Sequence, residues 1–397
     1  MRGALRVCPY ASPRCAAVVA FVAASIALAG CSTSRFGVPA GKALGADIDD
    51  MDPASLAEAA ERTEAALERA TRSVTIGGRK YSSRELAASA RRVAAIARSE
   101  SDPARLSKRL ARECRAYPAG EKAKVTGYFE PVLDARRRPD KRFRYPVYAP
   151  PSVPQLEKLR RELGRIPTRA DIDSGNALGG LGLELAWLDD PVARFFLHVQ
   201  GSGRLVFEDG SQTRIGFAGS NDLAYRSVGT VMLGQGLLER GKASATAMRK
   251  WLSAHPERRD ALLFTNPRYI YFRDNGRDGP IGALGATLVA GRSIATDDRF
   301  VPRGVLAWLR TTRPVVDADG TLVAKQPLTR FVFAQDAGAA IEGAARVDLF
   351  VGSGEAAGLE AGGMNEAGEL YVLMCRGSSP PGPPVPPRPM YRQMPRP

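Results

Sequence analysis

The side chain best placed to do chemistry is an aspartate inside an apolar strand pattern near the C-terminus. Asp348 stands between Val347 and Leu349 in the run RVDLFVG, residues 346–352. Removal of a carboxyl from water raises its pKa unless a cation pairs with it. A carboxyl that still holds its proton at about pH 6 to 7 can act as a general acid. The pattern also fits a structural aspartate that accepts hydrogen bonds from backbone N–H groups.

Two more aspartates share this ambiguity. Asp336 follows the apolar run FVFAQ and precedes Ala337-Gly338, and Asp297 lies in ATDD, residues 295–298. An aspartate followed by small residues is typical of a turn, where its carboxylate accepts backbone N–H groups. The local sequence therefore favours a turn-stabilising role for Asp336 over a catalytic one and leaves Asp297 open.

A third cluster is TGYFEP, residues 126–131, which places Thr126, Tyr128 and Glu130 around a glycine. A glycine beside aromatic rings, followed by an acid and a proline, can line a cleft. The same pattern fits the end of a strand with an exposed glutamate. Local information does not decide between the two interpretations.

A fourth cluster, HVQGSGR at residues 198–204, is interpreted as a tight turn at Gly201 that presents Gln200 and Ser202. It is too short and wrongly placed for a phosphate-binding loop. Amide and hydroxyl groups near aromatic rings suit sugar hydroxyl and acetamido groups. The cluster is thus a candidate for glycan contacts.

The composition limits the kind of chemistry. The chain has 397 residues, 57 Lys and Arg against 42 Asp and Glu, and a net charge of +15, which favours an anionic partner such as nucleic acid, anionic lipid or an acidic cell-surface polymer. Its two histidines, His198 and His255, are far apart in the sequence. A histidine-rich zinc site or a Ser-His-Asp triad is therefore a poor explanation, and acid/base work falls to carboxylates. We expect no metal and no cofactor.

The N-terminus predicts export. Residues 1–30 join an arginine-bearing start to a short apolar run, as in a signal peptide, and end in Leu28-Ala29-Gly30 before Cys31. This ending resembles a bacterial lipobox, so we expect a lipid anchor on Cys31, although a plain secretory signal with a chance cysteine also fits. Ser32 favours the outer membrane, on its periplasmic face. An exported, lipidated chain makes nucleic acid a remote partner.

The remaining elements follow from start and stop signals. Residues 31–48 are interpreted as a tether, and Asp52-Pro53, the Ser82 to Glu85 capping box and Asp102-Pro103 predict three helices within 52–116. Short strands separated by glycines follow, typical of a small curved barrel. The expected strands are VTGYF, RYPVYA, RFFLHVQ (194–200), RLVFEDG, TRIGFAG and the runs at 268–272, 287–294, 305–310, 330–335, 346–352 and 369–374. A helical pattern covers 225–254.

Two further features concern cysteine and proline. Cys114 and Cys375 remain after the predicted signal and lipidation site, and in an oxidising compartment they either pair or stay as two separate buried thiols. Residues 380–397 hold nine prolines and no acid. This composition predicts a disordered tail over 377–397.

Together the clusters resemble the membrane-bound lytic murein transglycosylase A family. The last two matching runs resemble a small three-aspartate domain whose acids are Asp297, Asp336 and Asp348. Ala339 stands where that family usually has a glycine. The matching runs are TGYFEPV (126–132), YPVY (145–148), LELAWLDDPVARFFLHVQGSGRL (183–205), GFAGSNDLAYRSVG (216–229), TNPRYIYF (265–272), GRSIATDDRFVPRG (291–304) and QDAGAAIEGAARVDLFVGSGEAAGLEAGGMNEAGELYVL (335–373).

The resemblance implies a mainly β fold. It implies a double-psi β-barrel formed by residues 49–138, which also carry the N-terminal helices, and by residues 260–376. A second β-barrel-like domain, residues 139–259, is inserted between them, and a substrate groove runs between the two domains.

The resemblance also implies an activity, namely exolytic cleavage of the β-1,4 bond between N-acetylmuramic acid and N-acetylglucosamine with a 1,6-anhydro product. Asp348 would be the single catalytic acid, because the C6 hydroxyl of the same sugar can replace the second carboxyl of a glycosidase. The residues expected to bind substrate are Asp336, Thr126, Tyr128, Glu130, Gln200, Gly201, Ser202 and Asp297. The expected partners are glycan strands and the membrane, with proteins of cell-wall synthesis or division left open.

Three other functions compete with this one. A peptidoglycan hydrolase would use Asp348 and Asp336 as a carboxylate pair. A non-catalytic lipoprotein would bind the wall without cutting it. An aspartic peptidase is disfavoured, because Asp173 in its faint motif Asp-Ser-Gly has no apolar strand before it and Ala337 lacks a hydroxyl.

Overall fold

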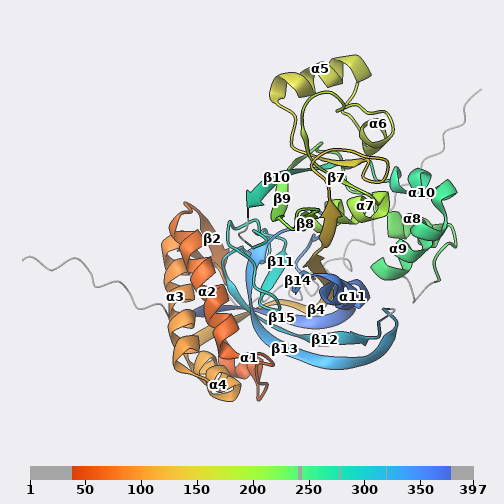
Figure 1. Cartoon of the computed structure of the whole chain (residues 1–397). Helices are drawn as coiled ribbons and strands as arrows, with labels where there is room; N and C mark the ends of the chain where they lie inside the picture. Colours follow the sequence, from red (N-terminus) through yellow and green to blue (C-terminus); the bar gives the residue numbers. More distant parts are fainter. Residues whose placement is uncertain (1–37, 240–243, 277–278, 319, 377–397) are drawn as a thin grey trace, which may run out of the picture.

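A closed β-barrel forms the centre of the molecule (Figure 1). The computed structural model describes residues 38–239, 244–276, 279–318 and 320–376. Within them the barrel strands pair in the order β4-β14-β11-β13-β12-β15, and β15 pairs back to β4. The strands are β4 (Cys114–Glu130), β11 (Ser293–Thr296), β12 (Leu306–Val316), β13 (Leu322–Asp336), β14 (Arg346–Ser353) and β15 (Asn365–Cys375). The pairs β4–β14 and β11–β13 are parallel and the others antiparallel.

The barrel strands are apolar on both faces because both faces are covered. Along β12, Ala307 and Leu309 join a core cluster that draws on all six strands, which identifies it as the barrel interior. Their neighbours Leu306 and Trp308 belong to a second cluster with residues of the N-terminal helices. Burial on both sides produces near-continuous apolar runs instead of strict alternation.

Three predicted helices, α2 (Pro53–Glu68), α3 (Ser83–Ser99) and α4 (Pro103–Glu113), cover the outside of the barrel. Asp52 and Asp102 accept backbone N–H groups as caps, and Ser82 and Glu85 form the expected capping box. Between α2 and α3 lies a hairpin that the sequence analysis missed, β2 (Ser73–Ile76) and β3 (Arg79–Ser82). Gly77 and Gly78 both have positive φ, as a two-residue hairpin turn requires.

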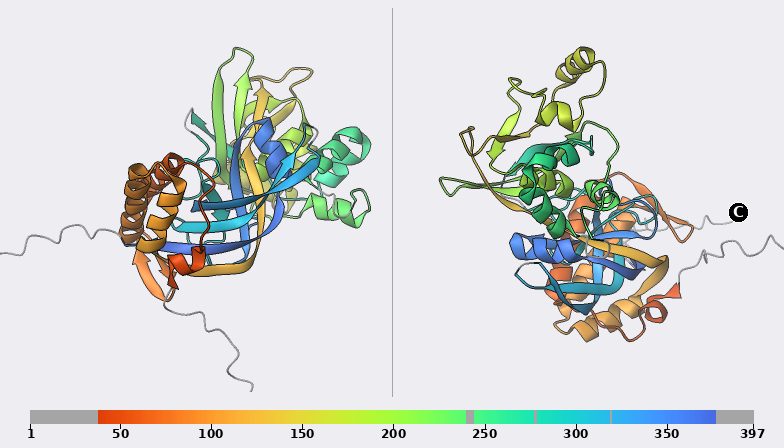
Figure 2. Two further views of the ribbon diagram at one scale, coloured as in Figure 1. Left: turned by 90° about the horizontal axis from the view of Figure 1, so that it is seen from below. Right: turned by 90° about the vertical axis from the view of Figure 1, so that its right-hand side faces the viewer.

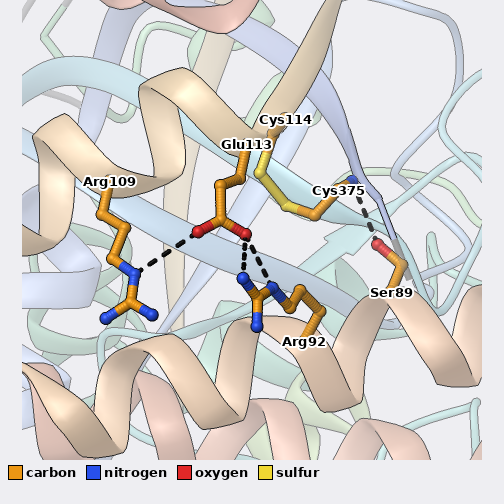
Figure 3. Close-up of a disulfide and its surroundings, with 6 residues drawn as sticks. All are labelled: Ser89, Arg92, Arg109, Glu113, Cys114 and Cys375. Atoms are coloured by element: carbon orange, nitrogen blue, oxygen red, sulfur yellow. Dashed lines mark hydrogen bonds and ion pairs between the residues drawn. A yellow bond between two sulfur atoms is a disulfide. The ribbon is translucent and has the colours of Figure 1, made fainter. Parts of the chain in front are cut away.

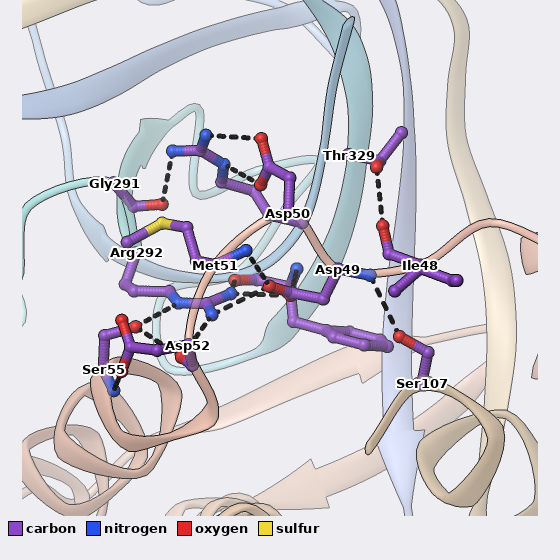
Figure 4. A network of polar contacts seen from close by, with 12 residues as sticks. Ile48, Asp49, Asp50, Met51, Asp52, Ser55, Ser107, Gly291, Arg292 and Thr329 are labelled. Atoms are coloured by element: carbon purple, nitrogen blue, oxygen red, sulfur yellow. Dashed lines mark hydrogen bonds and ion pairs between the residues drawn. The ribbon is translucent and has the colours of Figure 1, made fainter. Parts of the chain in front are cut away.

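The predicted tether over 31–48 is wrong for its described part. Residues 38–48 contain β1 (Val38–Pro39), which pairs with β4, and α1 (Ala40–Leu44), whose Ala40 and Leu44 are buried in the core. The residues after this segment are also bound to the barrel. Asp49 forms a fully buried ion pair with Arg292, which also donates to the Phe331 carbonyl (Figure 4). Cys31, residues 1–37 and the tail 377–397 lie outside the described residues.

The second unit is a four-stranded sheet in the order β10-β9-β8-β5, with helices around it, on a different side of the barrel from α2–α4 (Figure 2). It is an open sheet instead of the expected barrel-like domain, so the whole fold is mixed α/β and not mainly β. Its first strand begins at Val132 and its last strand ends at Gly276, so it covers a longer stretch of the sequence than the predicted 139–259. Its strands are β5 (Val132–Ala135), β8 (Ser202–Phe207), β9 (Gln212–Ser220) and β10 (Ile270–Gly276), with the separate pair β6 (Tyr145–Tyr148) and β7 (Glu184–Leu188).

Helices account for the rest of the described chain. In the second unit they are α5 (Val153–Leu163), α6 (Arg169–Asp173), α7 (Pro191–Gln200), α8 (Val228–Gly234), α9 (Ala245–Ala254) and α10 (Pro256–Leu263). The helix α11 (Glu355–Gly363) packs against β4 so closely that a Cβ at Gly127 would lie 2.9 Å from the backbone of Ala361. No helix in these ranges is long and apolar enough to cross a membrane.

The strands predicted at 194–200 and 287–294 are wrong. The first is part of α7, because Asp190 caps Val192, Pro191 opens the first turn and Gly201 ends the helix in the left-handed conformation. Its apolar residues therefore follow a helical period. In the second run only the last two residues belong to a strand, because β11 starts at Ser293.

Cys114 and Cys375 form a disulfide between the start of β4 and the end of β15 (Figure 3). These residues are register partners in the barrel, so the bond closes the seam where the first and last barrel strands meet. Beside it, Glu113 pairs with Arg92 and Arg109, which joins α3 and α4. The open alternative of two separate thiols is thereby decided in favour of a disulfide.

Candidate active site

The strand register brings two of the three aspartates to one level of the barrel wall. Ala295 on β11 pairs with Asp348 on β14 and with Asp336 on β13, and Asp348 pairs with Thr126 on β4. Register partners place their side chains on one face of a sheet. Val347 and Leu349 point into the barrel, so this face is the outer one.

A register shift between Ile294 and Ala295 is needed for this arrangement. Ile294 pairs with Ala334 and Ala295 pairs with Asp336, so β13 has one extra residue, Gln335, at this point. A bulge of this kind re-aims the side chains that follow it. It turns Asp336 to the same face as Asp348, whereas simple alternation from the interior residue Ala334 would point it inward.

Asp348 has the features expected of a general acid. Burial raises the pKa of its carboxyl to about 6, and the charge of nearby Asp336 acts in the same direction. The hydrogen bond from Thr126 and the positive charge of Arg346 oppose this shift without cancelling it. Residues of the strands on either side of β14, Ala295 and Tyr128, belong to a small apolar cluster together with Leu288, Ile341 and Phe350.

A hydrogen-bond chain fixes the orientation of this carboxyl. Arg346 Nη1 donates to Thr126 Oγ1 over 2.8 Å, and Thr126 Oγ1 lies 2.5 Å from Asp348 Oδ1. A guanidinium only donates and a hydroxyl has one proton, so Thr126 accepts from Arg346 and gives its own proton to Oδ1. This leaves Oδ2 as the oxygen that can carry the acidic proton of Asp348.

Asp336 lies at the end of β13, where one of its hydrogen bonds is local and the others come from distant parts of the chain. Its Oδ1 accepts the N–H groups of Ala283 and Ala337, each over 2.9 Å, and its Oδ2 accepts the hydroxyl of Tyr128 over 2.8 Å. Burial raises the pKa of Asp336, and these hydrogen bonds counteract the rise. Burial and the Asp336 charge also raise the pKa of Tyr128, so its hydroxyl stays a donor.

Asp297 lies in a different environment. Its carboxylate pairs with Arg299 over 2.6 Å and accepts the Gly343 N–H, and these contacts lower its pKa. Within the described ranges the structure gives it no hydrogen bond to Asp336 or Asp348. It ties the turn after β11 to the loop that leads into β14.

Glu130 ends β4, as one sequence interpretation has it, but it is buried instead of exposed. Its side chain is fully buried between the barrel and the second unit. It accepts from Arg214 Nε over 2.9 Å, from Arg204 Nη2 over 3.3 Å and from Ser353 Oγ over 2.7 Å. These contacts connect the barrel strand β4 with β8 and β9 of the second unit, and the buried Glu130 carboxylate itself is out of reach of a substrate.

Gln200, Gly201 and Ser202 also lie at this junction. Gln200 Oε1 accepts the backbone N–H of Phe129 over 3.0 Å, so the end of α7 is bound to β4 next to Tyr128. Gly201 is the left-handed cap of α7 and Ser202 begins β8, which makes the predicted tight turn a helix end. The local structure at these three residues thus differs from the predicted turn, and their glycan contacts stay a prediction.

The sequence analysis missed Arg346 and the backbone N–H of Ala283. Arg346 is two residues before Asp348 and thus on the same face of β14, a signal that strand alternation carries. Ala283 approaches Asp336 only through the tertiary fold, and no local pattern marks it. In the described part of the chain, no group of three or more His, Cys, Asp or Glu side chains could hold a metal ion.

Comparison with known proteins places these features in one family. Residues 124–273 match the MltA specific insert domain, and residues 292–374 match the 3D domain. A membrane-bound lytic murein transglycosylase A of Vibrio cholerae is 36% identical over 257 residues, which cover 64% of this chain and 66% of that protein. The Escherichia coli protein of the same name is 34% identical over 62% of this chain and 64% of its own length. These matches span just under two thirds of the two relatives.

Solved structures extend the match to most of the chain. A membrane-bound lytic murein transglycosylase from Agrobacterium tumefaciens has 31% identity and a TM-score of 0.69, with 83% of this chain and 94% of that chain covered. Escherichia coli MltA with bound chitohexaose has 27% identity and a TM-score of 0.67, with 83% and 92% covered. The chain therefore belongs to the MltA family of membrane-bound lytic murein transglycosylases.

Proposed function

We propose that this protein cleaves the β-1,4 bond between N-acetylmuramic acid and N-acetylglucosamine in peptidoglycan and leaves a 1,6-anhydromuramic acid end. The observation that carries the proposal is Asp348, a carboxyl whose burial raises its pKa to about 6 and whose orientation is fixed by Thr126. Family membership supplies the reaction type. The bound chitohexaose of the Escherichia coli relative supports a glycan strand as the substrate.

One carboxyl performs both proton transfers in this proposal. Asp348 gives the proton on Oδ2 to the glycosidic oxygen as the bond to the muramic C1 breaks. The carboxylate that results takes the proton of the C6 hydroxyl as that oxygen bonds to C1. The nucleophile belongs to the same sugar, so its attack has the entropic advantage of an intramolecular reaction. No water is consumed, and Asp348 ends the cycle protonated.

The remaining residues support this acid. The negative charge of Asp336 favours the protonated form of Asp348, while Arg346 and Thr126 limit the rise of its pKa and orient it. We assign Tyr128 and Gln200 to positioning, because they bind Asp336 and the Phe129 backbone, and leave Ser202 and Asp297 as proposed substrate contacts.

We likewise propose the double-psi topology, an exo mode, the lipid anchor at Cys31 and the periplasmic face of the outer membrane from the resemblance and the N-terminal sequence.

The test is mass spectrometry of the products that the chain from Ser32 onward releases from purified peptidoglycan. Muropeptides one water lighter than the hydrolysis products, without a reducing end, are expected. Products with a free reducing end would replace the proposal with hydrolysis and make Asp336 a catalytic partner. Binding of peptidoglycan without any product would replace it with a wall-binding protein.

A further inference from the structure

A hollow lies at the opposite end of β4 from Asp348. It has a volume of about 1180 Å³ and is bounded by the end of α2, the hairpin β2–β3, the start of α3 and the disulfide-linked ends of β4 and β15. Arg115, which lines it, is eleven residues before Thr126 on β4. At roughly 3.3 Å per residue, about 36 Å of strand separate the hollow from the catalytic carboxyl.

Arginine dominates the lining of this hollow. Two glutamates, Glu68 and Glu85, and six arginines contribute to it, and the arginines are Arg72, Arg79, Arg84, Arg91, Arg115 and Arg376. Among them, Arg72 pairs with Asp298, Arg79 with Glu85, and Arg91 with Glu64 and Glu68. Arg84 and Arg376 have exposed side chains at the rim. With the partners Glu64 and Asp298 included, four carboxylates face six arginines, and a concave surface with this surplus of positive charge attracts anions, carboxylates in particular.

The hollow also has an apolar floor. Tyr81, Tyr117 and Met374 contribute to it, and the hairpin turn is pressed onto the Tyr117 ring so closely that a Cβ at Gly77 would lie 2.1 Å from it. The turn and the ring therefore fit only with glycine at this position. An apolar floor inside an arginine rim suits a short peptide that bears carboxylates. Anionic lipid headgroups are the other source of negative charge, but the concave shape and the apolar floor favour one peptide over a flat layer of headgroups.

The C-terminal segment of the chain does not complement this hollow. Residues 377–397, which follow Arg376 in the sequence, contain no acid and carry the arginines Arg388, Arg392 and Arg396. Like charges on the segment and on the rim repel each other. The complementary ligand is therefore part of another molecule.

We propose that this hollow binds the carboxylate-bearing stem peptides of the peptidoglycan strand whose glycan is cut at Asp348. The inference rests on the proposed function, which makes this polymer the substrate. A contact far from the reacting bond adds a second point of attachment and raises the effective concentration of the strand at the active site. It lowers KM for strands that bear peptides and leaves kcat unchanged, because it contributes equally to the ground state and the transition state.

The double variant Arg84→Glu/Arg376→Glu tests this directly. Glutamate is favourable in the first turn of α3, and both side chains are exposed, so the fold is expected to remain. The matched control is Arg160→Glu/Arg161→Glu, the same change of charge on α5, which Figure 1 places far from α3. Each protein is assayed on glycan strands with stem peptides and on the same strands after an amidase has removed them.

On peptide-bearing strands KM of the rim variant is expected to rise about fivefold above that of the wild type and of the control, with kcat unchanged. On peptide-free strands the three proteins are expected to agree. Equal KM values for the rim variant and the control on both substrates would overturn the proposal.

A binding measurement separates this proposal from the proposed function. Stem peptides released by the amidase are titrated into Asp348→Asn, with and without the rim substitutions, by calorimetry. Saturable binding that the rim substitutions weaken supports the hollow as the peptide site. If the wild type makes no anhydro product from either kind of strand, the proposed function fails while the titration still reports on the hollow. Absence of peptide binding, or rim-dependent binding to phosphatidylglycerol vesicles instead, would refute the peptide site.

Discussion

Asp348 and Asp297 belong to the same small three-aspartate region and have pKa values displaced in opposite directions. Asp297 has the less exposed side chain by surface area, yet Arg299 and the Gly343 N–H stabilise its charge and lower its pKa. Asp348 is more exposed but has no cation in direct contact, and burial of its carboxyl raises the pKa to about 6. Whether a buried aspartate acts as an acid therefore depends on the partners of its oxygens more than on its exposed area.

The largest effect is expected from Asp348, the proposed catalytic acid. Asp348→Asn is expected to lower kcat by about a thousandfold or more, because the amide cannot transfer a proton. Release of anhydromuropeptides measures it, with binding to peptidoglycan as the control for fold and affinity. Asp297→Asn is the matched variant and is expected to keep most of the activity. An equal loss in both variants would contradict the separate roles given to them.

The second effect concerns stability. The folded-state pKa of Asp348 is above its unfolded value, so its contribution to stability is present at low pH and is lost as pH rises from about 4 to about 6. The wild type is therefore expected to lose about 2 to 3 kcal/mol of unfolding free energy between pH 4 and pH 8 through Asp348, and Asp348→Asn is expected to avoid this loss. The variant should thus gain stability relative to the wild type as the pH rises. Urea unfolding at the two pH values measures this.

Asp297→Asn should give the opposite sign in the same experiment. Its folded-state pKa is lowered, so the ionised form stabilises the protein above the unfolded pKa and that stability is lost on acidification. The variant is expected to be less stable than the wild type at pH 8 and close to it in acid. Parallel shifts in the two variants would show that charge alone, and not local partners, sets their behaviour.

A smaller effect sharpens the role of Thr126. Thr126→Val keeps the shape and removes the hydrogen bond that favours the ionised form of Asp348. The pKa of Asp348 should rise, so the activity, which needs its proton, should persist to higher pH by up to about one unit, while kcat falls about tenfold because Oδ1 is no longer oriented. A pH–rate profile of kcat tests this, and an unchanged alkaline limb would be evidence against the hydrogen-bond chain.

The smallest effect is expected at Arg299. Arg299→Ala removes the ion pair that lowers the pKa of Asp297 and leaves the contacts of Asp348 unchanged. Because the arginine is largely exposed, we expect activity within about twofold of wild type. The pKa of Asp297 should rise toward its ordinary value, which NMR titration of the carboxyl can follow. Loss of activity comparable to Thr126→Val would mean that Asp297 belongs to the reacting group after all.

Much of the local structure could be predicted from the sequence because its signals are local. Asp52-Pro53 and the Ser82 capping box mark helix starts by hydrogen bonds within one turn, and Asp336 before Ala-Gly marks a turn in the same way. The prediction for 194–200 was wrong because its apolar residues fit both the period of a strand and that of a helix. Only the caps at Asp190 and Gly201 distinguish the helix from a strand.

Neighbouring residues are enough to mark the candidate acids, because an acid between apolar residues and a series of family-like motifs can be recognised without the fold. The contacts of each acid depend on the tertiary structure. The register and one bulge bring Asp336 to the face of Asp348, Arg204 and Arg214 reach Glu130 from about 80 residues away, and Cys114 meets Cys375 across the barrel seam. The pKa of a carboxyl depends on the groups within a few ångströms, and here those groups come from distant parts of the chain.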